Sequence, residues 1–170
     1  MDINPASSPD IPVLVALMNS AYRGEQSKQG WTTEADLVEG ELRTDEKTLD
    51  QLMHAEGAVI LKCTSEKGTI IGCVYLQKRG NKLYLGMLSV SPLLQAKGIG
   101  KKLMLAAETY ARSQNCQSVF MRVISVRDEL IAWYERLGYK KTGILEPFPS
   151  DDRFGRPVQP IEFAVMEKNL

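Results

Sequence analysis

The stretch "LSVSPLLQAKGIGKKLM", residues 88–104, leads from an apolar run into a segment with helical periodicity. Gly98 and Gly100 stand where that helix should begin, although glycine destabilises a helix by roughly 1 kcal/mol relative to alanine. The N-terminus of a helix presents unpaired N–H groups and a partial positive charge, and both attract phosphate. Glycine lets a phosphate approach the backbone closely, and lysines on either side add positive charge. The stretch therefore predicts a strand, a phosphate-binding turn and a helix in succession.

The rest of the chain alternates between helical and strand-like patterns. Helices are predicted over residues 8–23, 44–54, 99–114 and 128–138, and strands over 58–64, 69–78, 82–90, 118–125, 139–145 and 161–169. Residues 24–34 form a polar loop, and residues 146–160 a proline-rich one. The strand–helix–strand unit over residues 82–125 implies a right-handed crossover and a parallel pair. We therefore expect an α/β fold of the α+β type, in which about four helices flank a mixed, twisted, mostly antiparallel sheet of six to seven strands.

Length and composition favour a single domain over residues 1–170, since the apolar and charged fractions are ordinary for a globular protein. The formal net charge is zero, so no overall field favours nucleic acid or a membrane surface as a partner. Cys63, Cys73 and Cys116 fit no metal-binding spacing, so we expect no metal site and buried, reduced thiols. The N-terminus lacks the pattern of a signal peptide, and no apolar run near it is long enough to span a bilayer. We therefore expect a cytoplasmic protein.

The spacing of the glycines separates several known phosphate loops. The nucleoside-triphosphate loop G-x-x-x-x-G-K-[ST] fails at Gln95 and Lys102, where it needs a glycine and a hydroxyl residue. The dinucleotide fingerprint G-x-G-x-x-G fails at Leu103, where a third glycine is needed. The pattern that does fit is Q-x-x-G-x-G, formed by Gln95, Gly98 and Gly100 behind a strand.

This Q-x-x-G-x-G turn resembles the acyl-CoA pyrophosphate loop of the GNAT superfamily of N-acetyltransferases. A second segment, "ELIAWYERLGYKKTG" at residues 129–143, resembles that family's motif Tyr-x-x-x-Gly-aromatic and follows at the right distance. The expected order of elements is also similar to the family's over about residues 8–168. The resemblance implies acetyl-CoA as a co-substrate and, as a guess from the family alone, a homodimer.

The resemblance also implies how the donor is held. Backbone amides of the turn would bind the CoA pyrophosphate with Lys101 beside them, and these turn residues are Gln95, Ala96, Lys97, Gly98, Ile99 and Gly100. Leu88, Ser89 and Val90 would pair with the pantetheine arm, in the gap where this strand bulges and splays from the next parallel strand. An amide near Leu88 or Ser89 would then polarise the thioester carbonyl.

Further site residues follow from the same resemblance. Tyr134 stands where the family has its general acid, and Arg127 replaces an asparagine that contacts the cofactor in many members, so a phosphate contact by Arg127 stays open. The acceptor would lie near the end of the first helix and the loop after it, at Tyr22, Arg23, Glu25 and Trp31. No general base is assigned, because Glu25, Glu162 and an ordered water are all open.

The predicted function is acetyl-CoA-dependent transfer of an acetyl group to a primary amine of a small molecule or peptide, by direct attack on the thioester. No activated serine or cysteine arrangement indicates a covalent intermediate. Two alternatives stay open, namely a non-catalytic acyl-CoA-binding or sensor domain of the same fold and an unrelated α/β phosphate-binding module. Tyr134 has an alternative too, as a core residue of an amphipathic helix. Antibiotic, polyamine, amino acid and protein N-terminus all remain possible acceptors.

Overall fold

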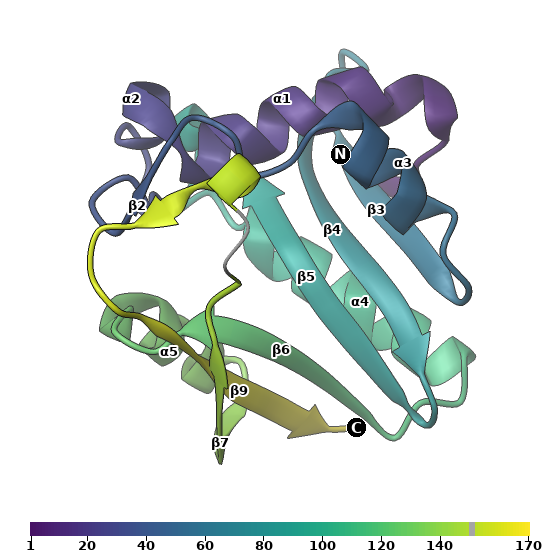
Figure 1. Ribbon diagram of the computed structural model, residues 1–170. Helices are drawn as coiled ribbons and strands as arrows, with labels where there is room; N and C mark the ends of the chain where they lie inside the picture. The colour runs from purple at the N-terminus through teal and green to yellow at the C-terminus, as the bar shows by residue number, and fades with distance from the viewer. Residues whose placement is uncertain (150–151) are drawn as a thin grey trace.

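A mixed sheet of seven strands forms the centre of the computed structural model, which describes residues 1–149 and 152–170 (Figure 1). Its strands are β1 (Asp2–Pro5), β3 (Ala58–Thr64), β4 (Ile70–Arg79), β5 (Lys82–Val90), β6 (Ser118–Ile124), β7 (Lys140–Pro147) and β9 (Glu162–Asn169). They lie in the order β1-β3-β4-β5-β6-β9-β7. Only β5 and β6 run parallel, and the other described neighbours are antiparallel. The predicted mixed, mostly antiparallel sheet is confirmed.

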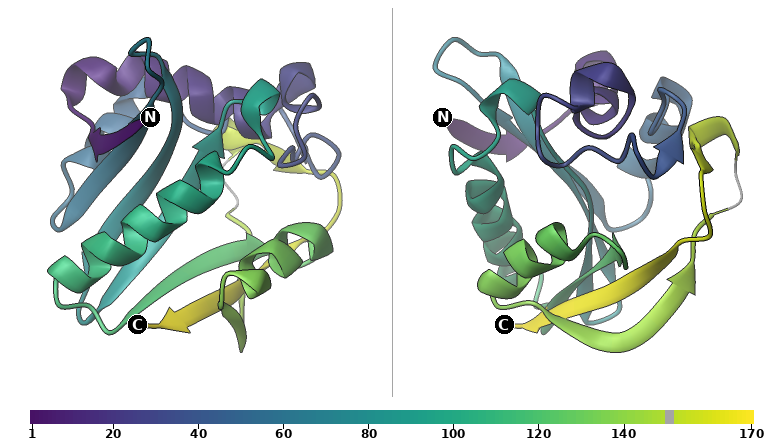
Figure 2. Two further views of the ribbon diagram at one scale, coloured as in Figure 1. Left: turned by 180° about the vertical axis from the view of Figure 1, so that it is seen from behind. Right: turned by 90° about the vertical axis from the view of Figure 1, so that its left-hand side faces the viewer.

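Helices cover both faces of this sheet. They are α1 (Ile11–Tyr22), α2 (Gly24–Ser27), α3 (Glu46–Met53), α4 (Ile99–Ser113) and α5 (Asp128–Arg136), with 3-10 turns at Ser8–Asp10, Pro92–Leu94 and Asp152–Phe154. Successive residues of a strand point to opposite faces. Accordingly Val74 and Leu76 of β4 pack in one apolar cluster with α4 and α5, whereas Cys73 and Tyr75 pack in another with α1 and α3. The view from behind shows α4 and α5 together on the first of these faces (Figure 2).

The parallel pair separates along its length, and this separation creates room in the sheet. β5 and β6 pair only from Lys82 to Tyr84, and beyond that point the two strands diverge (Figure 1). The β4–β5 register also shifts between Cys73 and Tyr75, opposite Met87, whose φ is +53°. An extra residue in one strand of this kind is a β-bulge, which bends the strand and increases its twist. The bulge and the splay are both as predicted.

Four elements differ from the sequence-based expectation. β1 lies in a polar segment with no strand signal, and it forms because it pairs with the edge of β3, where Pro5 is tolerated. The single turn α2 falls in the predicted loop over residues 24–34, so there are five helices instead of about four. A two-stranded sheet joins β2 (Val38–Glu39) to β8 (Arg156–Pro157), and β8 lies in the predicted loop over residues 146–160. No helix in the described part of the chain is long and apolar enough to cross a membrane.

Candidate active site

The turn between β5 and α4 presents a row of unpaired backbone donors. Ala96 and Gly98 adopt left-handed conformations, with φ of +66° and +83°. The first backbone bond of α4 runs from the Lys102 N–H to the Gly98 carbonyl at 3.1 Å. None of the N–H groups from Gln95 to Lys101 has an acceptor within residues 1–149 and 152–170. Successive N–H groups around a helix N-terminus form a concave site for an anion.

The side chain of Gln95 fixes this turn to the loop that follows α2. Its Oε1 accepts a hydrogen bond from the Trp31 N–H at 2.8 Å, and its Nε2 donates to Thr32 Oγ1 at 2.7 Å and to the Val90 carbonyl at 3.0 Å. A Cβ added at Gly30 would overlap Gln95 Oε1, so a side chain at that position would displace the Gln95 amide. The glutamine of Q-x-x-G-x-G therefore holds the turn in place with its side chain.

The last residues of β5 leave backbone groups facing the gap beside β6. The Ser91 N–H donates to the Ile71 carbonyl at 3.0 Å, so the backbone N–H of Ser91 points toward β4. Because the backbone groups of successive strand residues point to alternate sides, those of Leu88 and Val90 point away from β4. They point toward the side on which β6 has already diverged. Their carbonyls accept side-chain hydrogen bonds, from the Tyr22 hydroxyl to Leu88 and from Gln95 to Val90. The N–H groups of Leu88 and Val90 stay open to an extended ligand.

Ser89, between these two residues, is oriented differently. It pairs with Cys73 of β4, and only 1% of its surface is exposed. Its hydroxyl donates to the Met87 carbonyl at 3.0 Å, across the bulge. Ser89 thus stabilises the bulge and does not line the cavity described next.

Two cavities meet at the end of β5. The first, the turn cavity, lies between the phosphate turn and α5, and its lining includes Gln95, Ala96, Gly98, Ile99, Gly100, Lys101, Trp31 and Trp133. The second, the splay cavity, lies between the diverging ends of β5 and β6, and its lining includes Glu34, Arg43, Met87, Arg122, Arg127 and Phe163. Tyr22, Leu88, Leu130 and Tyr134 line both cavities. These four residues therefore form the boundary between the two cavities.

Tyr134 on α5 stands at this junction in a largely apolar setting. It is 6% exposed, and its ring packs edge-on against Trp133 and Tyr139, with centroids 5.0 and 6.1 Å away. Its hydroxyl has no hydrogen-bond partner among the described residues. Burial, with a smaller contribution from the nearby Tyr22, raises the pKa of Tyr134 well above its usual value. The hydroxyl therefore keeps its proton near neutral pH and can donate it.

Known proteins share this arrangement. Residues 19–139 match the family described as Acetyltransferase (GNAT) family. The chain belongs to the GNAT family of acetyltransferases. As a member of this acetyltransferase family it uses acetyl-CoA as its acyl donor.

Individual relatives are distant from this GNAT acetyltransferase. The uncharacterized protein YdhI of Bacillus subtilis (strain 168) is 29% identical over 108 residues, which are 62% of this chain and 63% of YdhI, less than two thirds of its length. The ribosomal-protein-alanine N-acetyltransferase of Brucella melitensis superposes with a TM-score of 0.74 at 18% identity over 100% of both chains. A phosphinothricin acetyltransferase of Sinorhizobium meliloti in complex with AcCoA gives 0.71 at 16% identity, over 99% of this chain and 88% of that one. At these identities the two structures establish the fold of the acetyltransferase.

The residues around the turn cavity suit acetyl-CoA. The unpaired N–H groups from Gln95 to Lys101 can take a diphosphate, and the open amides of Leu88 and Val90 can pair with an extended pantetheine arm. Lys101 is an exposed cation on this cavity. Lys97 lies elsewhere, on a separate surface hollow with Ile71.

The two lysines that follow Gly100 provide a matched test of charge in the donor site. Lys101→Ala should raise the KM for acetyl-CoA about 2- to 5-fold, because an exposed ion pair contributes roughly 0.5–1 kcal/mol. Lys102→Ala should leave it unchanged, since Lys102 lines neither cavity. Initial rates at low and high salt measure both effects, and the Lys101 effect should shrink as salt screens it. Equal effects from the two variants would contradict this placement of the phosphates.

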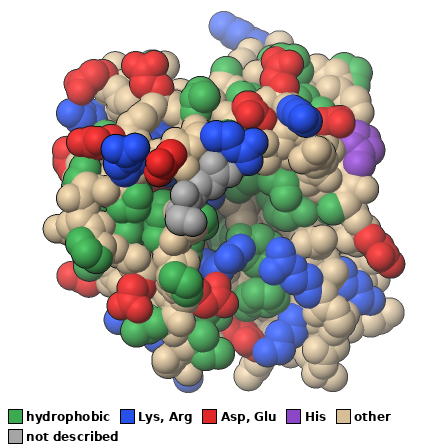
Figure 3. Space-filling view, in the orientation of Figure 1, with side chains coloured by type: hydrophobic (Ala, Val, Ile, Leu, Met, Phe, Trp, Pro, Cys, Tyr) green, Lys and Arg blue, Asp and Glu red, His purple; other side chains and the backbone are tan. Residues whose placement is uncertain are grey.

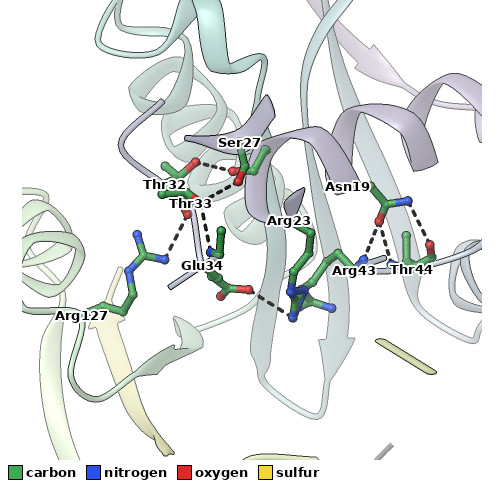
Figure 4. A network of polar contacts seen from close by, with 11 residues as sticks. Asn19, Arg23, Ser27, Thr32, Thr33, Glu34, Arg43, Thr44 and Arg127 are labelled. Atoms are coloured by element: carbon green, nitrogen blue, oxygen red, sulfur yellow. Dashed lines mark hydrogen bonds and ion pairs between the residues drawn. The ribbon is translucent and has the colours of Figure 1, made fainter. Parts of the chain in front are cut away.

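The guanidinium of Arg127 makes hydrogen bonds to backbone carbonyls of the protein. Its Nη1 donates to the Thr32 carbonyl at 3.1 Å (Figure 4). Its Nη2 donates to the Trp31 carbonyl at 3.3 Å. It borders the splay cavity and not the turn cavity, where the unpaired N–H groups lie. Arg127 holds the loop after α2 against the start of α5.

The predicted acceptor residues are only partly brought together. Tyr22 lines both cavities, and Trp31 lines the turn cavity with its ring edge-on to Trp133 at 6.0 Å. Arg23 is buried against Glu34, with Nη2 and Oε1 3.3 Å apart. Glu25 is exposed and pairs with Lys28 at 2.9 Å, away from either cavity.

Sequence reasoning did not single out three charged residues that line the splay cavity, Glu34, Arg43 and Arg122. Glu34 is the last residue of the predicted loop over residues 24–34, three residues after Trp31, so its charge within that loop was the signal that could have found it. Its backbone N–H donates to the Tyr22 carbonyl at 2.8 Å, which places it beside the end of α1. Arg43 precedes α3 in a polar segment whose pattern gives no indication of a site.

Proposed function

We propose that this acetyltransferase transfers the acetyl group of acetyl-CoA to a primary amine of a small molecule or peptide by direct attack on the thioester. The observation that supports this best is the meeting of the two cavities at Tyr22, Leu88, Leu130 and Tyr134. The turn cavity suits the donor, and the splay cavity, on the far side of Tyr134, suits the acceptor. The thioester would lie between them, beside the Leu88 amide.

Each group at the junction has a part in this reaction. The Leu88 N–H, open on the gap side of β5, can donate to the oxyanion that develops on the thioester carbonyl. The protonated hydroxyl of Tyr134 can donate to the departing thiolate. None of the three cysteines lines either cavity, and burial raises the pKa of the Cys73 thiol to about 12. Direct attack by the amine is therefore favoured over a covalent acyl-enzyme.

Glu34 is the carboxylate in position to receive the amine. An alkyl ammonium has a pKa of roughly 10 and must lose its proton before it attacks. Among the described residues, Glu34 is the only carboxylate that lines the splay cavity, whereas Glu25 and Glu162 do not line it. Its side chain is about one-eighth exposed. We assign Glu34 the binding of the ammonium and, through water, the first step of its proton's path to solvent.

A thiol-release assay tests the proposal. The chain is given acetyl-CoA and a panel of amines that holds amino acids, polyamines, aminoglycosides, phosphinothricin and peptides with a free N-terminal alanine. Release of CoA thiol that depends on one of these amines, with the acetylated product seen by mass spectrometry, supports the proposal. If acetyl-CoA raises the melting temperature but no amine increases thiol release above hydrolysis, the chain is an acyl-CoA-binding or sensor domain instead.

A further inference from the structure

A third cavity adjoins the splay cavity and carries two arginines. We call it the arginine cavity, and its described lining is Arg23, Glu34, Arg43, Phe148, Pro149, Phe154 and Phe163. Glu34, Arg43 and Phe163 also line the splay cavity, so the two cavities are adjacent. The space-filling view shows this face hollowed near its centre, with Lys and Arg side chains around the hollow (Figure 3).

The charges in the arginine cavity are unbalanced. Arg23 is 3% exposed, and its only ionic partner in the described part of the chain is Glu34. Among the described residues, the Nε and Nη1 atoms of Arg23 have no hydrogen-bond partner. The half-buried guanidinium of Arg43 makes no hydrogen bond or ion pair with any described residue, and it lies close enough to Arg23 to lower that group's pKa, although burial is the larger cause. Two guanidinium groups thus share one carboxylate.

Surrounding contacts hold these two arginines where they are. Asn19 Oδ1 accepts hydrogen bonds from the backbone N–H groups of Arg43 and Thr44 at 2.6 and 3.0 Å, which fixes the backbone of Arg43 against α1 (Figure 4). The segment at Gly155 covers Arg23, since a Cβ built there would lie 3.4 Å from Arg23 Nε. Burying a charge without a partner is costly, and an anion with matching oxygens would offset that cost. The arrangement is thus organised in advance for an anion.

We propose that the acceptor of this acetyltransferase carries a carboxylate as well as its amine, and that Arg43 with Arg23 binds this carboxylate. This proposal rests on the proposed acetyl transfer. The amine would lie at Glu34 and Tyr134 in the splay cavity, and the carboxylate would reach into the arginine cavity. Phe148, Phe154 and Phe163 surround that anion with apolar surface, which strengthens its attraction to the guanidinium groups. Free amino acids and peptides with an acidic N-terminal residue share this chemistry.

Matched acceptor pairs test the inference. At saturating acetyl-CoA, kcat/KM is measured for a set of amino acids and for their C-terminal amides. The set includes amino acids with an acidic side chain and amino acids with a neutral one. The ratio of kcat/KM between each acid and its amide is then compared. We expect carboxylate acceptors to exceed their uncharged partners at least 10-fold. Preference for a free α-carboxylate would indicate an amino acid, and preference for a side-chain carboxylate in the amides would indicate a peptide. Equal turnover of all acids and amides would overturn the inference while leaving acetyl transfer intact.

The variant Arg43→Gln locates the carboxylate site. It should lower kcat/KM for acceptors that carry a carboxylate 10- to 100-fold. It should lower kcat/KM for amides without a carboxylate much less, and it should leave the KM for acetyl-CoA unchanged. Arg43→Lys should restore part of the loss, and Arg112→Gln, an exposed position on α4, serves as the control. An equal loss for acids and amides with Arg43→Gln would overturn the assignment.

A binding measurement keeps the inference testable if no turnover is found. Calorimetric titration of the CoA-saturated chain with an amino acid and with its amide measures the anion site without chemistry. Tighter binding of the acid, lost in Arg43→Gln, would support the carboxylate site even where acetyl transfer fails. Binding of neither acid nor amide, at concentrations up to tens of millimolar, would overturn it.

Discussion

The variant Tyr134→Phe should lower kcat by about 10²- to 10⁴-fold, because it removes the proton donor proposed for the departing thiolate. The phenyl ring keeps the contacts with Trp133 and Tyr139, so the KM for acetyl-CoA should change little. Single-turnover rates with a good amine acceptor measure the chemical step, and calorimetric titration with CoA measures donor binding. Loss of rate with retained binding would distinguish an enzyme from an acyl-CoA sensor.

Tyr139→Phe is the matched control for this experiment. Tyr139 is also a buried tyrosine, and its hydroxyl donates to Glu108 Oε1 at 3.2 Å, outside both cavities. Its loss should cost roughly 1 kcal/mol of unfolding free energy and leave kcat intact. If Tyr134→Phe retains more than a third of the wild-type kcat, the hydroxyl has no part in the rate-limiting chemistry and Tyr134 is a core residue.

The pH profile gives a second readout of the same hydroxyl. A general acid must be protonated, and burial raises the pKa of Tyr134 well above its usual value. Its protonated form therefore persists as pH rises, so kcat should show no decline between pH 8 and about pH 10 from its ionisation. The rate should fall only toward low pH, where the amine gains a proton. A descending limb centred near pH 9 in the wild type, absent from Tyr134→Phe, would contradict the burial argument.

The parts of the fold that the sequence predicts well are those with a strong local signal. The bounds of β3 and β5, Ala58–Thr64 and Lys82–Val90, coincide with the predicted strands, because each is an apolar run between turn residues. The start of α4 at Ile99 follows from Gly98, whose left-handed conformation ends the preceding turn. β1 has no comparable pattern, and its pairing with β3 depends on contacts about 60 residues away in the chain.

The same distinction between local and tertiary signals applies to the candidate site. The residues proposed to bind the donor form one continuous turn, so Gln95 to Lys101 could be proposed from spacing and resemblance. Its acceptor half is assembled from loops, in which Glu34 and Arg43 are positioned by contacts with the end of α1. No periodicity marks such residues, because each is fixed by tertiary hydrogen bonds. Arg127 differs from both, since its motif position leaves a phosphate contact open and its side chain donates to two carbonyls of the loop after α2.

The variant Gly98→Val should raise the KM for acetyl-CoA by roughly 100-fold, through the backbone of the phosphate turn. Gly98 has a φ of +83°, a region that a β-branched residue avoids. Relief of that strain moves the turn and misaligns its N–H groups, and the loss of two charge-assisted hydrogen bonds at about 1.5 kcal/mol each amounts to about 3 kcal/mol. Initial rates over a range of acetyl-CoA concentrations measure the change, while kcat at saturating donor should fall less.

Gly80→Val is a control that distinguishes the effect of backbone strain from the loss of N–H groups that bind phosphate. Gly80 lies in the β4–β5 turn at the opposite end of β5, with a φ of +62°, and a Cβ there, like one at Gly98, would meet no atom within 4 Å. Both variants should therefore lose a similar amount of stability, about 1–2 kcal/mol by thermal unfolding. Only Gly98→Val should lose affinity for CoA and ADP-like fragments, because only its turn exposes unpaired amides to a diphosphate. If both variants bind CoA as tightly as the wild type, the diphosphate is held by some other part of the protein and the reading of residues 95–101 is wrong.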